Sequence, residues 1–319
     1  MQLRCTELPI LYQKIDMNIL KFAEQYPDEL RCRNDFKTKR EGQGVICKKC
    51  SCTDHYWLKN KWQWQCKKCS FRTTIRSGTI MENSNLPVRM WYLCMALMSM
   101  TKKGISAKEM QRQLSHKRYE PIWTMMHKIR AAMGCRDALY SLEGEIEFDE
   151  GYFTHGIRKG SKPKRGRGSQ NKKNVAVIAE STQLEDLETG KVTKQCRYFK
   201  MKVLDSHEAD QIDDLLQDKL DEKTLVFSDK SSSYVNIGDY VEVHIQERSD
   251  AETTKTILKW VHIAIANAKR WLLGIHHMVK GKYLQNYLNE FCYKLNRRYF
   301  GNKLFDRVSI AVAKSYWHD

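Results

Sequence analysis

Residues 145–153 read EIEFDEGYF, and apolar and acidic residues alternate through the first part of this stretch. Side chains of a β-strand point alternately to its two faces, so the alternation predicts a strand with one face in a protein core. Asp149 lies in the middle of this strand, where a charged side chain is costly unless it is used. The stretch therefore predicts a sheet and a candidate site residue together.

The sequence that follows predicts the rest of a mixed α/β sheet. The further strands are NVAVIAE (174–180), QCRYFKMKVL (195–204), TLVFSD (224–229) and YVEVHI (240–245). An amphipathic helix is predicted at 207–220, between the third and fourth strands, and a long helix runs from about 251 to 272. This order is typical of a mixed sheet that is covered by helices.

The charge of the chain favours a polyanionic partner. The 319 residues include 55 Lys and Arg against 38 Asp and Glu, a net charge of +17. Residues 201–250 hold 5 basic and 13 acidic residues, so the remaining residues carry a net charge of +25. No apolar run of about 18 residues and no signal pattern occurs, which predicts a cytoplasmic protein without a membrane partner.

Four of the eleven cysteines have the spacing of a zinc ribbon. Cys47, Cys50, Cys66 and Cys69 form C-x2-C-x15-C-x2-C, and four thiolates leave no open position on a tetrahedral ion. We therefore expect a structural Zn²⁺ in a ribbon at residues 45–80. Cys52 is an alternative ligand beside the first pair, but the spacing favours Cys50.

Residues 85–140 predict a small helical module. Its three helices are PVRMWYLCMALMSM (87–100), TKKGISAKEMQRQL (101–114) and PIWTMMHKIRAAMG (121–134). Ser106 is the predicted N-cap of the second helix, and Pro121 and Gly134 the start and stop of the third. Three short helices with a tight turn suit a helix-turn-helix-like DNA-binding module. Residues 1–44 predict a helical lead-in.

Asp229 is a second candidate site residue because it ends the strand at 224–229 and precedes a turn. Metal-dependent phosphodiester chemistry needs acidic or amide oxygens that converge on two divalent cations. Two acids at strand positions of one α/β pattern, Asp149 and Asp229, meet this requirement.

Several segments together resemble one family over about residues 45–315. They are EIEFDEGYF (145–153), KRGRGSQNKKNVAVIAE (164–180), LVFSDKSSSY (225–234) and VHIAIANAKRWLLGIHHMVKGKYLQNYLNEFCYKLNRR (261–298). In this order they resemble bacterial insertion-sequence transposases of the zinc-ribbon type with an RNase H-like DDE core. The resemblance implies an RNase H-like mixed sheet flanked by helices at 145–319, with a basic insertion at 155–173.

The resemblance also implies a metal site. Asp149 and Asp229 would be ligands of Mg²⁺ or Mn²⁺, with a third ligand on the long helix that follows. Asn267 stands opposite the usual glutamate, 38 residues after Asp229, and its amide oxygen can coordinate without adding charge. Glu252 and Glu290 remain rival third ligands.

Basic residues predict contacts to DNA phosphates. They are Lys164, Arg165, Arg167, Lys172, Lys173, Lys269, Arg270, Arg297 and Arg298. The expected partner is double-stranded DNA, namely the terminal inverted repeats of an insertion sequence and its target, bound by a homodimer or higher oligomer.

Three functions follow from this pattern. The first is a DNA transposase that cleaves at the element ends and joins the 3′-hydroxyl to target DNA by two-metal chemistry. The alternative is a non-catalytic, site-specific DNA-binding protein derived from a transposase. A ribonuclease or junction nuclease would share the acids, but the zinc ribbon and the helical module argue against this third function.

Overall fold

The fold is described by a computed structural model. It describes residues 18–156, 171–185, 192–204, 209–221, 223–230, 234, 236–239, 241–247, 256–301 and 303–316. The predicted DNA contacts Lys164, Arg165 and Arg167 and the rival ligand Glu252 lie outside the described residues. No helix in the described part of the chain is long and apolar enough to cross a membrane.

The N-terminal part contains two helices and a small sheet. The helices are α1 (Ile19–Gln25) and α2 (Glu29–Gln43), and the strands are β1 (His55–Leu58), β2 (Gln63–Cys66) and β3 (Arg72–Thr74). The three strands form an antiparallel sheet in the order β1-β2-β3. This sheet is joined to α2 by Trp64, whose buried indole Nε1 donates to Glu41 Oε1 at 3.1 Å.

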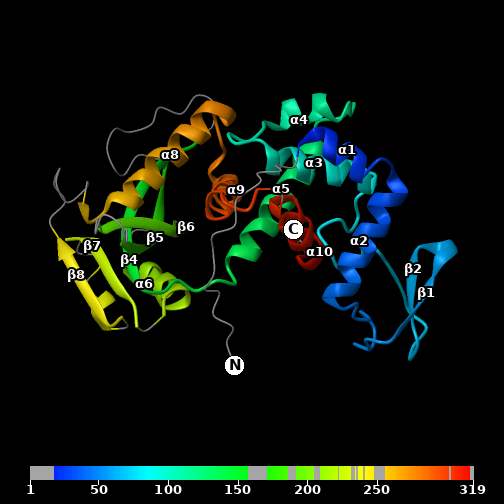
Figure 1. Ribbon diagram of the computed structural model, residues 1–319, viewed down its shortest axis with the longest axis horizontal. Coiled ribbons are helices and arrows are strands. Elements are labelled where there is room, and N and C mark those ends of the chain that lie inside the picture. Colours follow the sequence, from blue (N-terminus) through cyan, green and yellow to red (C-terminus); the bar gives the residue numbers. More distant parts are fainter. Residues whose placement is uncertain are drawn as a thin grey trace.

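A bundle of helices follows the small sheet. It contains α3 (Val88–Met100), α4 (Ala107–Gln113), α5 (Glu120–Asp137) and α10 (Lys303–Lys314). The C-terminal helix α10 places Phe305, Val308 and Val312 in one apolar core with residues of α2, α3 and α5 (Figure 1). The end of the chain therefore packs with the N-terminal helices.

Two of the three predicted helix signals in this bundle are confirmed. Ser106 caps α4, because its side chain accepts from the Glu109 N–H, and Pro121 lies in the first turn of α5. The predicted stop at Gly134 is wrong, since α5 continues to Asp137. A Cβ at Gly134 would lie 2.2 Å from Asn289 Nδ2, so this glycine serves the close packing of α5 against α9.

The larger sheet has five strands in the order β6-β5-β4-β7-β8. These strands are β4 (Glu145–Thr154), β5 (Lys172–Glu185), β6 (Val192–Leu204), β7 (Leu225–Asp229) and β8 (Val243–Glu247). Strands β4, β5 and β6 are antiparallel neighbours, whereas β7 runs parallel to β4 and β8 parallel to β7. This is the RNase H-like mixed sheet that the sequence predicts.

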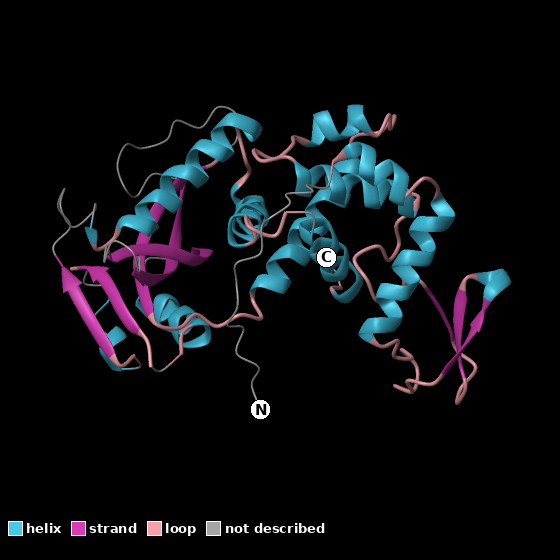
Figure 2. Ribbon diagram, viewed as in Figure 1, coloured by secondary structure: helices cyan, strands magenta, loops and turns pink. Residues whose placement is uncertain are grey.

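Helices cover both faces of the sheet (Figure 2). They are α6 (Ala209–Lys219) on one face, and α8 (Lys259–His276) and α9 (Leu284–Asn296) on the other. Val175, Val177 and Ala179 of β5 face α8, while Ala176 and Ile178 face α6. Both faces of β5 are buried, which explains why its sequence is a continuous apolar run.

Short 3-10 turns complete the described part. They are η1 (Lys59–Lys61), η3 (Ile237–Asp239) and η4 (Gly281–Tyr283). The helical bundle meets the sheet domain where α5 packs on α9, and α9 in turn packs on β6. Strand β4, which carries Asp149, lies in the centre of the sheet and is hydrogen-bonded to β5 on one side and to β7 on the other.

Candidate active site

The sheet brings Asp149 and Asp229 side by side on the neighbouring strands β4 and β7. The parallel strands β4 and β7 pair in register up to Phe148 and Ser228, and each aspartate is the next residue of its strand. Neighbouring strands lie about 4.8 Å apart, so the two carboxylates are close neighbours. The two carboxylates also interact electrostatically, because the charge of Asp229 raises the pKa of Asp149.

Asp149 is held in an environment that disfavours its charge. Burial is the largest cause, and with the charges of Asp229 and Glu150 it raises the pKa of Asp149 to about 7. The backbone N–H of Glu150, which donates to Asp149 Oδ1 at 2.7 Å, and the nearby Lys269 ammonium lower this pKa in part. Such a pair of carboxylates is stabilised by a cation, which favours the ionised form.

His262 on α8 is the third side chain of this cluster. Its Nε2 lies 3.7 Å from Asp149 Oδ2, which is too long for a hydrogen bond. This nitrogen is buried and has no hydrogen-bond partner among the described residues. Burial lowers the pKa of His262 and the charge of Asp229 opposes this shift only in part, so the imidazole is neutral at pH 7. A neutral imidazole is the form that binds metals.

Helix α8 can approach β4 because Gly151 has no side chain. A Cβ at Gly151 would lie 3.2 Å from Ile265 Cγ1 and 3.1 Å from Phe153 Cε2. His262 and Lys269 are seven residues apart, or about 20° around the helix, so both face the strand beside Asp149. A bulkier residue at 151 would push this face of α8 away from the aspartates.

Asn267 lies on another side of the same helix. It follows His262 by five residues, which is about 140° around the helix axis. Its Oδ1 accepts a hydrogen bond from Arg270 Nη2 at 2.8 Å. The structure thus turns His262 and Lys269 toward Asp149, and turns the amide of Asn267 away from it.

Of the two rival glutamates, only Glu290 lies in the described part of the chain. It is fully buried on α9, and its Oε2 accepts from Arg130 Nε of α5 at 2.7 Å. Its charge is therefore matched by a buried guanidinium at the interface between two helices.

The ribbon cysteines also come together. The four thiol sulfurs lie within 4.8 Å of one another, and Cys52 is not among them. Both cysteine pairs fold alike: the N–H of Ser51 donates to the Cys47 carbonyl at 2.9 Å, and that of Ser70 to the Cys66 carbonyl at 3.0 Å. Four sulfurs at this spacing fit a zinc ribbon with a closed tetrahedral site.

The sequence of the sheet domain matches a known family. Residues 141–296 match the family described as the ISXO2-like transposase domain. This segment belongs to that transposase family. The match begins just before β4 and ends with α9, so it includes Asp149, Asp229 and His262 and stops before α10. A search of curated proteins found no match.

Of the predicted DNA contacts, Lys269 lies near Asp149, and Lys172 and Lys173 lie on the neighbouring strand. Lys172 and Lys173 begin β5 opposite Thr154 and Phe153, and Lys269 Nζ lies 5.5 Å from the Phe153 ring centre. The pKa of Lys269 is lowered by burial first and then by the charge of Lys172, whereas Asp149 opposes the shift. Lys269 thus lies near Asp149, and Lys172 and Lys173 extend the positive charge farther along β5.

The remaining predicted contacts differ in exposure. Arg270 is exposed on α8, and Arg298 is exposed but donates to the Leu295 and Cys196 carbonyls. Arg297 is 2% exposed and its Nη1 lies 2.5 Å from Asp137 Oδ1. A guanidinium buried in this ion pair joins α9 to α5 and does not face a DNA phosphate.

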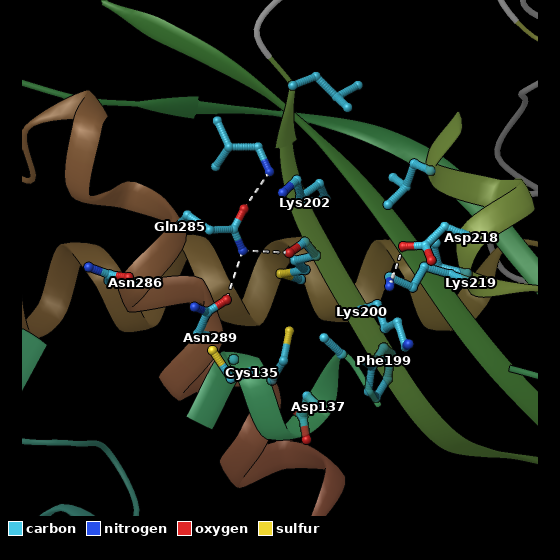
Figure 3. Close-up of a pocket in the computed structure, with 18 of the residues that line it drawn as sticks. Cys135, Asp137, Phe199, Lys200, Lys202, Asp218, Lys219, Gln285, Asn286 and Asn289 are labelled. Carbon is cyan, nitrogen blue, oxygen red and sulfur yellow. Dashed lines mark hydrogen bonds and ion pairs between the residues drawn. The ribbon is translucent and has the colours of Figure 1, made fainter. Parts of the chain in front are cut away.

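The transposase domain also borders a cavity of about 650 Å³ between α5, β6, α6 and α9 (Figure 3). Its labelled lining residues are Cys135, Asp137, Phe199, Lys200, Lys202, Asp218, Lys219, Gln285, Asn286 and Asn289. None of the predicted site residues lines it. The cavity is therefore separate from the aspartate pair.

The amides near this cavity cover the edge strand β6. Gln285 accepts from the Val203 N–H at 2.8 Å and donates to the Met201 carbonyl at 3.0 Å. Asn296 does the same for Phe199, at 2.8 Å and 2.9 Å. Side chains of α9 thereby form the hydrogen bonds to β6 that a neighbouring strand would otherwise form.

His262 is the member of this cluster that the sequence pattern did not predict. The detectable signal was its spacing from Lys269, seven residues on one helix, since such residues share a face. The expected third ligand was an amide or carboxylate oxygen, from Asn267 or from its rivals Glu252 and Glu290, and histidine does not fit that expectation. Only the packing of α8 on β4 shows which face is turned to Asp149.

Proposed function

We propose that the chain is a DNA transposase that cleaves at insertion-sequence ends and joins the 3′-hydroxyl to target DNA. One observation carries this proposal: Asp149 and Asp229 lie side by side on neighbouring strands of an RNase H-like sheet, and His262 of α8 lies beside Asp149. The transposase family of residues 141–296 supports it. In this proposal His262 takes the third ligand position that the sequence had assigned to Asn267.

The donor set fits a divalent metal. Adjacent ligands of an octahedral ion with bonds of about 2.1 Å are about 3.0 Å apart, and opposite ligands about 4.2 Å. The 3.7 Å between His262 Nε2 and Asp149 Oδ2 lies between these values. Carboxylates suit Mg²⁺ and Mn²⁺, whereas imidazole suits later transition metals, so the mixed set favours Mn²⁺ over Mg²⁺. A bound cation would supply an activated water and charge neutralisation at the phosphate.

The protein itself would orient the DNA at this site. Lys269 lies near Asp149 and Lys172 near Lys269, and both would bind phosphates on either side of the bond that is cut. The raised pKa of Asp149 means that its carboxyl loses a proton when the site is loaded near neutral pH. His262 stays neutral and keeps Nε2 unprotonated toward Asp149.

We place further DNA contacts of the helical module on α4 and its flanking loops. Half of the 18 residues of α5 are buried, so little of α5 can enter a groove of DNA. The exposed basic residues at α4 are Lys102, Lys103, Lys108, Arg112, Lys117 and Arg118. Gly104 lets the loop before α4 lie against α8, because a Cβ at this position would be 3.0 Å from the Trp271 ring.

A DNA cleavage assay tests the proposal. The substrate is a plasmid with the DNA that flanks the gene, incubated with the full chain and Mn²⁺. We expect strand cleavage at the flanking ends, no cleavage by Asp149→Ala or Asp229→Ala, and retained DNA binding by both variants. In the same binding measurement, the double variant Lys117→Ala with Arg118→Ala should weaken DNA binding. The slope of the logarithm of the binding constant against the logarithm of the salt concentration should become less steep by about 2.

The alternative function is a non-catalytic DNA-binding protein. It is favoured if the wild-type chain binds the flanking DNA and neither Mn²⁺ nor Mg²⁺ supports cleavage. A ribonuclease activity would appear as cleavage of RNA or junction substrates without a requirement for the flanking ends. Either result would contradict the transposase proposal.

A further inference from the structure

Glu147 joins the catalytic strand to the start of α8. It lies on β4 and is fully buried, at 0% exposure. Its Oε2 accepts hydrogen bonds from the backbone N–H groups of Trp260 at 2.6 Å and Val261 at 3.2 Å. A carboxylate 113 residues earlier in the chain thus binds the first turn of the helix.

The helix needs this acceptor because its own sequence does not supply one. The first N–H groups of a helix have no partner within the helix and are usually satisfied by a Ser, Thr, Asp or Asn side chain at the N-cap. The N-cap of α8 is Leu258, which makes no side-chain cap hydrogen bond. The negative charge of Glu147 is also favourable at the positive end of the helix dipole.

The two bonded amides lie next to the proposed ligand. His262 immediately follows Val261, and Asp149 follows Glu147 by two residues and so faces the same side of β4. One carboxylate therefore sets the position of the helix start relative to the strand. A local cap at 258 would satisfy the same N–H groups but would leave the helix free to shift along the sheet.

We propose that Glu147 is a positioning residue that holds His262 beside Asp149 for metal binding. This inference rests on the proposed function of His262. Glu147 acts through the backbone of α8: its Oε2 is occupied by two N–H groups. Partners that orient a ligand commonly change metal affinity by about 10- to 100-fold when they are removed.

The test measures Mn²⁺ binding to the full chain, by the electron paramagnetic resonance signal of free Mn²⁺. Glu147→Gln keeps an oxygen that can accept both N–H groups, and we expect an affinity within about threefold of wild type. Glu147→Ala removes the acceptor, and we expect at least about tenfold weaker binding. In a His262→Ala background, Glu147→Ala should have no further effect, because its action passes through His262.

Asp28→Ala is the matched control, because it removes the N-cap of α2, which lies outside the transposase domain and the proposed DNA contacts. It should lower the unfolding temperature without changing Mn²⁺ affinity. Nonspecific DNA binding and zinc content report whether each variant is folded. If Glu147→Ala does not fold, the Glu147→Gln variant decides. An Mn²⁺ affinity near that of wild type supports the positioning role. A loss of affinity as large as that of Asp149→Ala would make Glu147 a metal ligand and overturn the positioning role.

The outcomes separate this inference from the proposed function. Wild-type Mn²⁺ affinity in Glu147→Ala, with weak binding in His262→Ala, overturns the positioning role alone. An additive loss in the double variant also overturns it, since Glu147 would then act independently of His262. Unchanged affinity in His262→Ala, Asp149→Ala and Asp229→Ala would instead contradict the metal site itself.

Discussion

Arg130 on α5 and Glu290 on α9 form a buried ion pair, with 2.7 Å between Nε and Oε2 and side chains that are 1% and 0% exposed. The guanidinium carbon also lies 4.2 Å from the ring centre of Tyr287. The pair therefore holds the helical bundle to the transposase domain at the point where the two meet. This pairing also explains why a carboxylate is buried at position 290, so no metal is needed to balance its charge.

The first prediction concerns this pair. Glu290→Ala leaves Arg130 as a buried charge without its partner and should lower the free energy of unfolding by about 3 to 5 kcal/mol. Urea unfolding followed by circular dichroism measures the loss. The double variant Arg130→Met with Glu290→Leu should recover much of it, because it removes both charges. A Glu290→Ala variant that is as stable as wild type but binds Mn²⁺ more weakly would contradict this role and indicate that Glu290 is a metal ligand.

Local patterns explain why most elements could be predicted. The alternation in 145–153, the cysteine spacing and the Ser106 cap each depend on a few neighbouring residues, and each agrees with the structure. Gly134 shows the limit of such signals. Glycine commonly ends a helix, but here it allows Asn289 of α9 to lie against α5, and that contact depends on a residue 155 positions away.

The candidate site could be predicted only in part for the same reason. Asp149 and Asp229 are marked by strand patterns around them, so their residue types and positions point to the site. The third side chain depends on the rotation of α8 about its axis. This rotation is set by contacts such as Ile265 with Gly151 and Glu147 with Val261, and no periodicity within 251–272 contains them.

The second prediction separates His262 from Asn267. His262→Ala should abolish metal-dependent cleavage, while Asn267→Ala should keep most of it, because the Asn267 amide binds Arg270 rather than facing Asp149. His262→Glu replaces the imidazole by a harder ligand and should shift the preference from Mn²⁺ toward Mg²⁺. Cleavage rates across a titration of each metal measure both effects. The reverse pattern, with Asn267→Ala inactive and His262→Ala active, would restore Asn267 as the ligand.

The third prediction follows from the pKa of Asp149, which is raised from 3.8 to about 7. A carboxyl with a raised pKa in the folded state stabilises that state at low pH, and this contribution is lost as the pH rises from about 4 to about 7. A shift of this size corresponds to at most about 4 kcal/mol. The metal-free wild type should therefore lose more stability between pH 5 and pH 8 than Asp149→Asn does.

Metal binding provides the complementary measurement of the same group. Since the ionised carboxylate is the ligand, Mn²⁺ affinity should rise up to about tenfold per pH unit below 7 and level off above it. Parallel stability curves for wild type and Asp149→Asn, together with a pH-independent Mn²⁺ affinity, would contradict the assignment.

The fourth prediction is that one Zn²⁺ per chain is bound by Cys47, Cys50, Cys66 and Cys69. A Cys66→Ser variant or a chelator should remove the ion and unfold the ribbon at 45–75, because so small a sheet has little other core. The fluorescence of the ribbon tryptophans should then move to longer wavelength, while Mn²⁺ binding persists. Cys52→Ser is the matched control and should keep the zinc, since Cys52 lies outside the sulfur cluster. Zinc-free wild-type protein with a folded ribbon would refute this prediction.

The last prediction concerns the covered edge of the sheet. Gln285→Leu should leave the Val203 N–H and the Met201 carbonyl without their partner and lower the free energy of unfolding by about 1 to 3 kcal/mol. An uncovered strand edge also pairs readily with other chains, so we expect concentration-dependent association in sedimentation velocity. Gln285→Glu is the matched control: its carboxylate still accepts from Val203 but cannot donate to Met201, which should give an intermediate loss. A Gln285→Leu variant that is as stable and as monodisperse as wild type would show that the α9 amides do not protect β6.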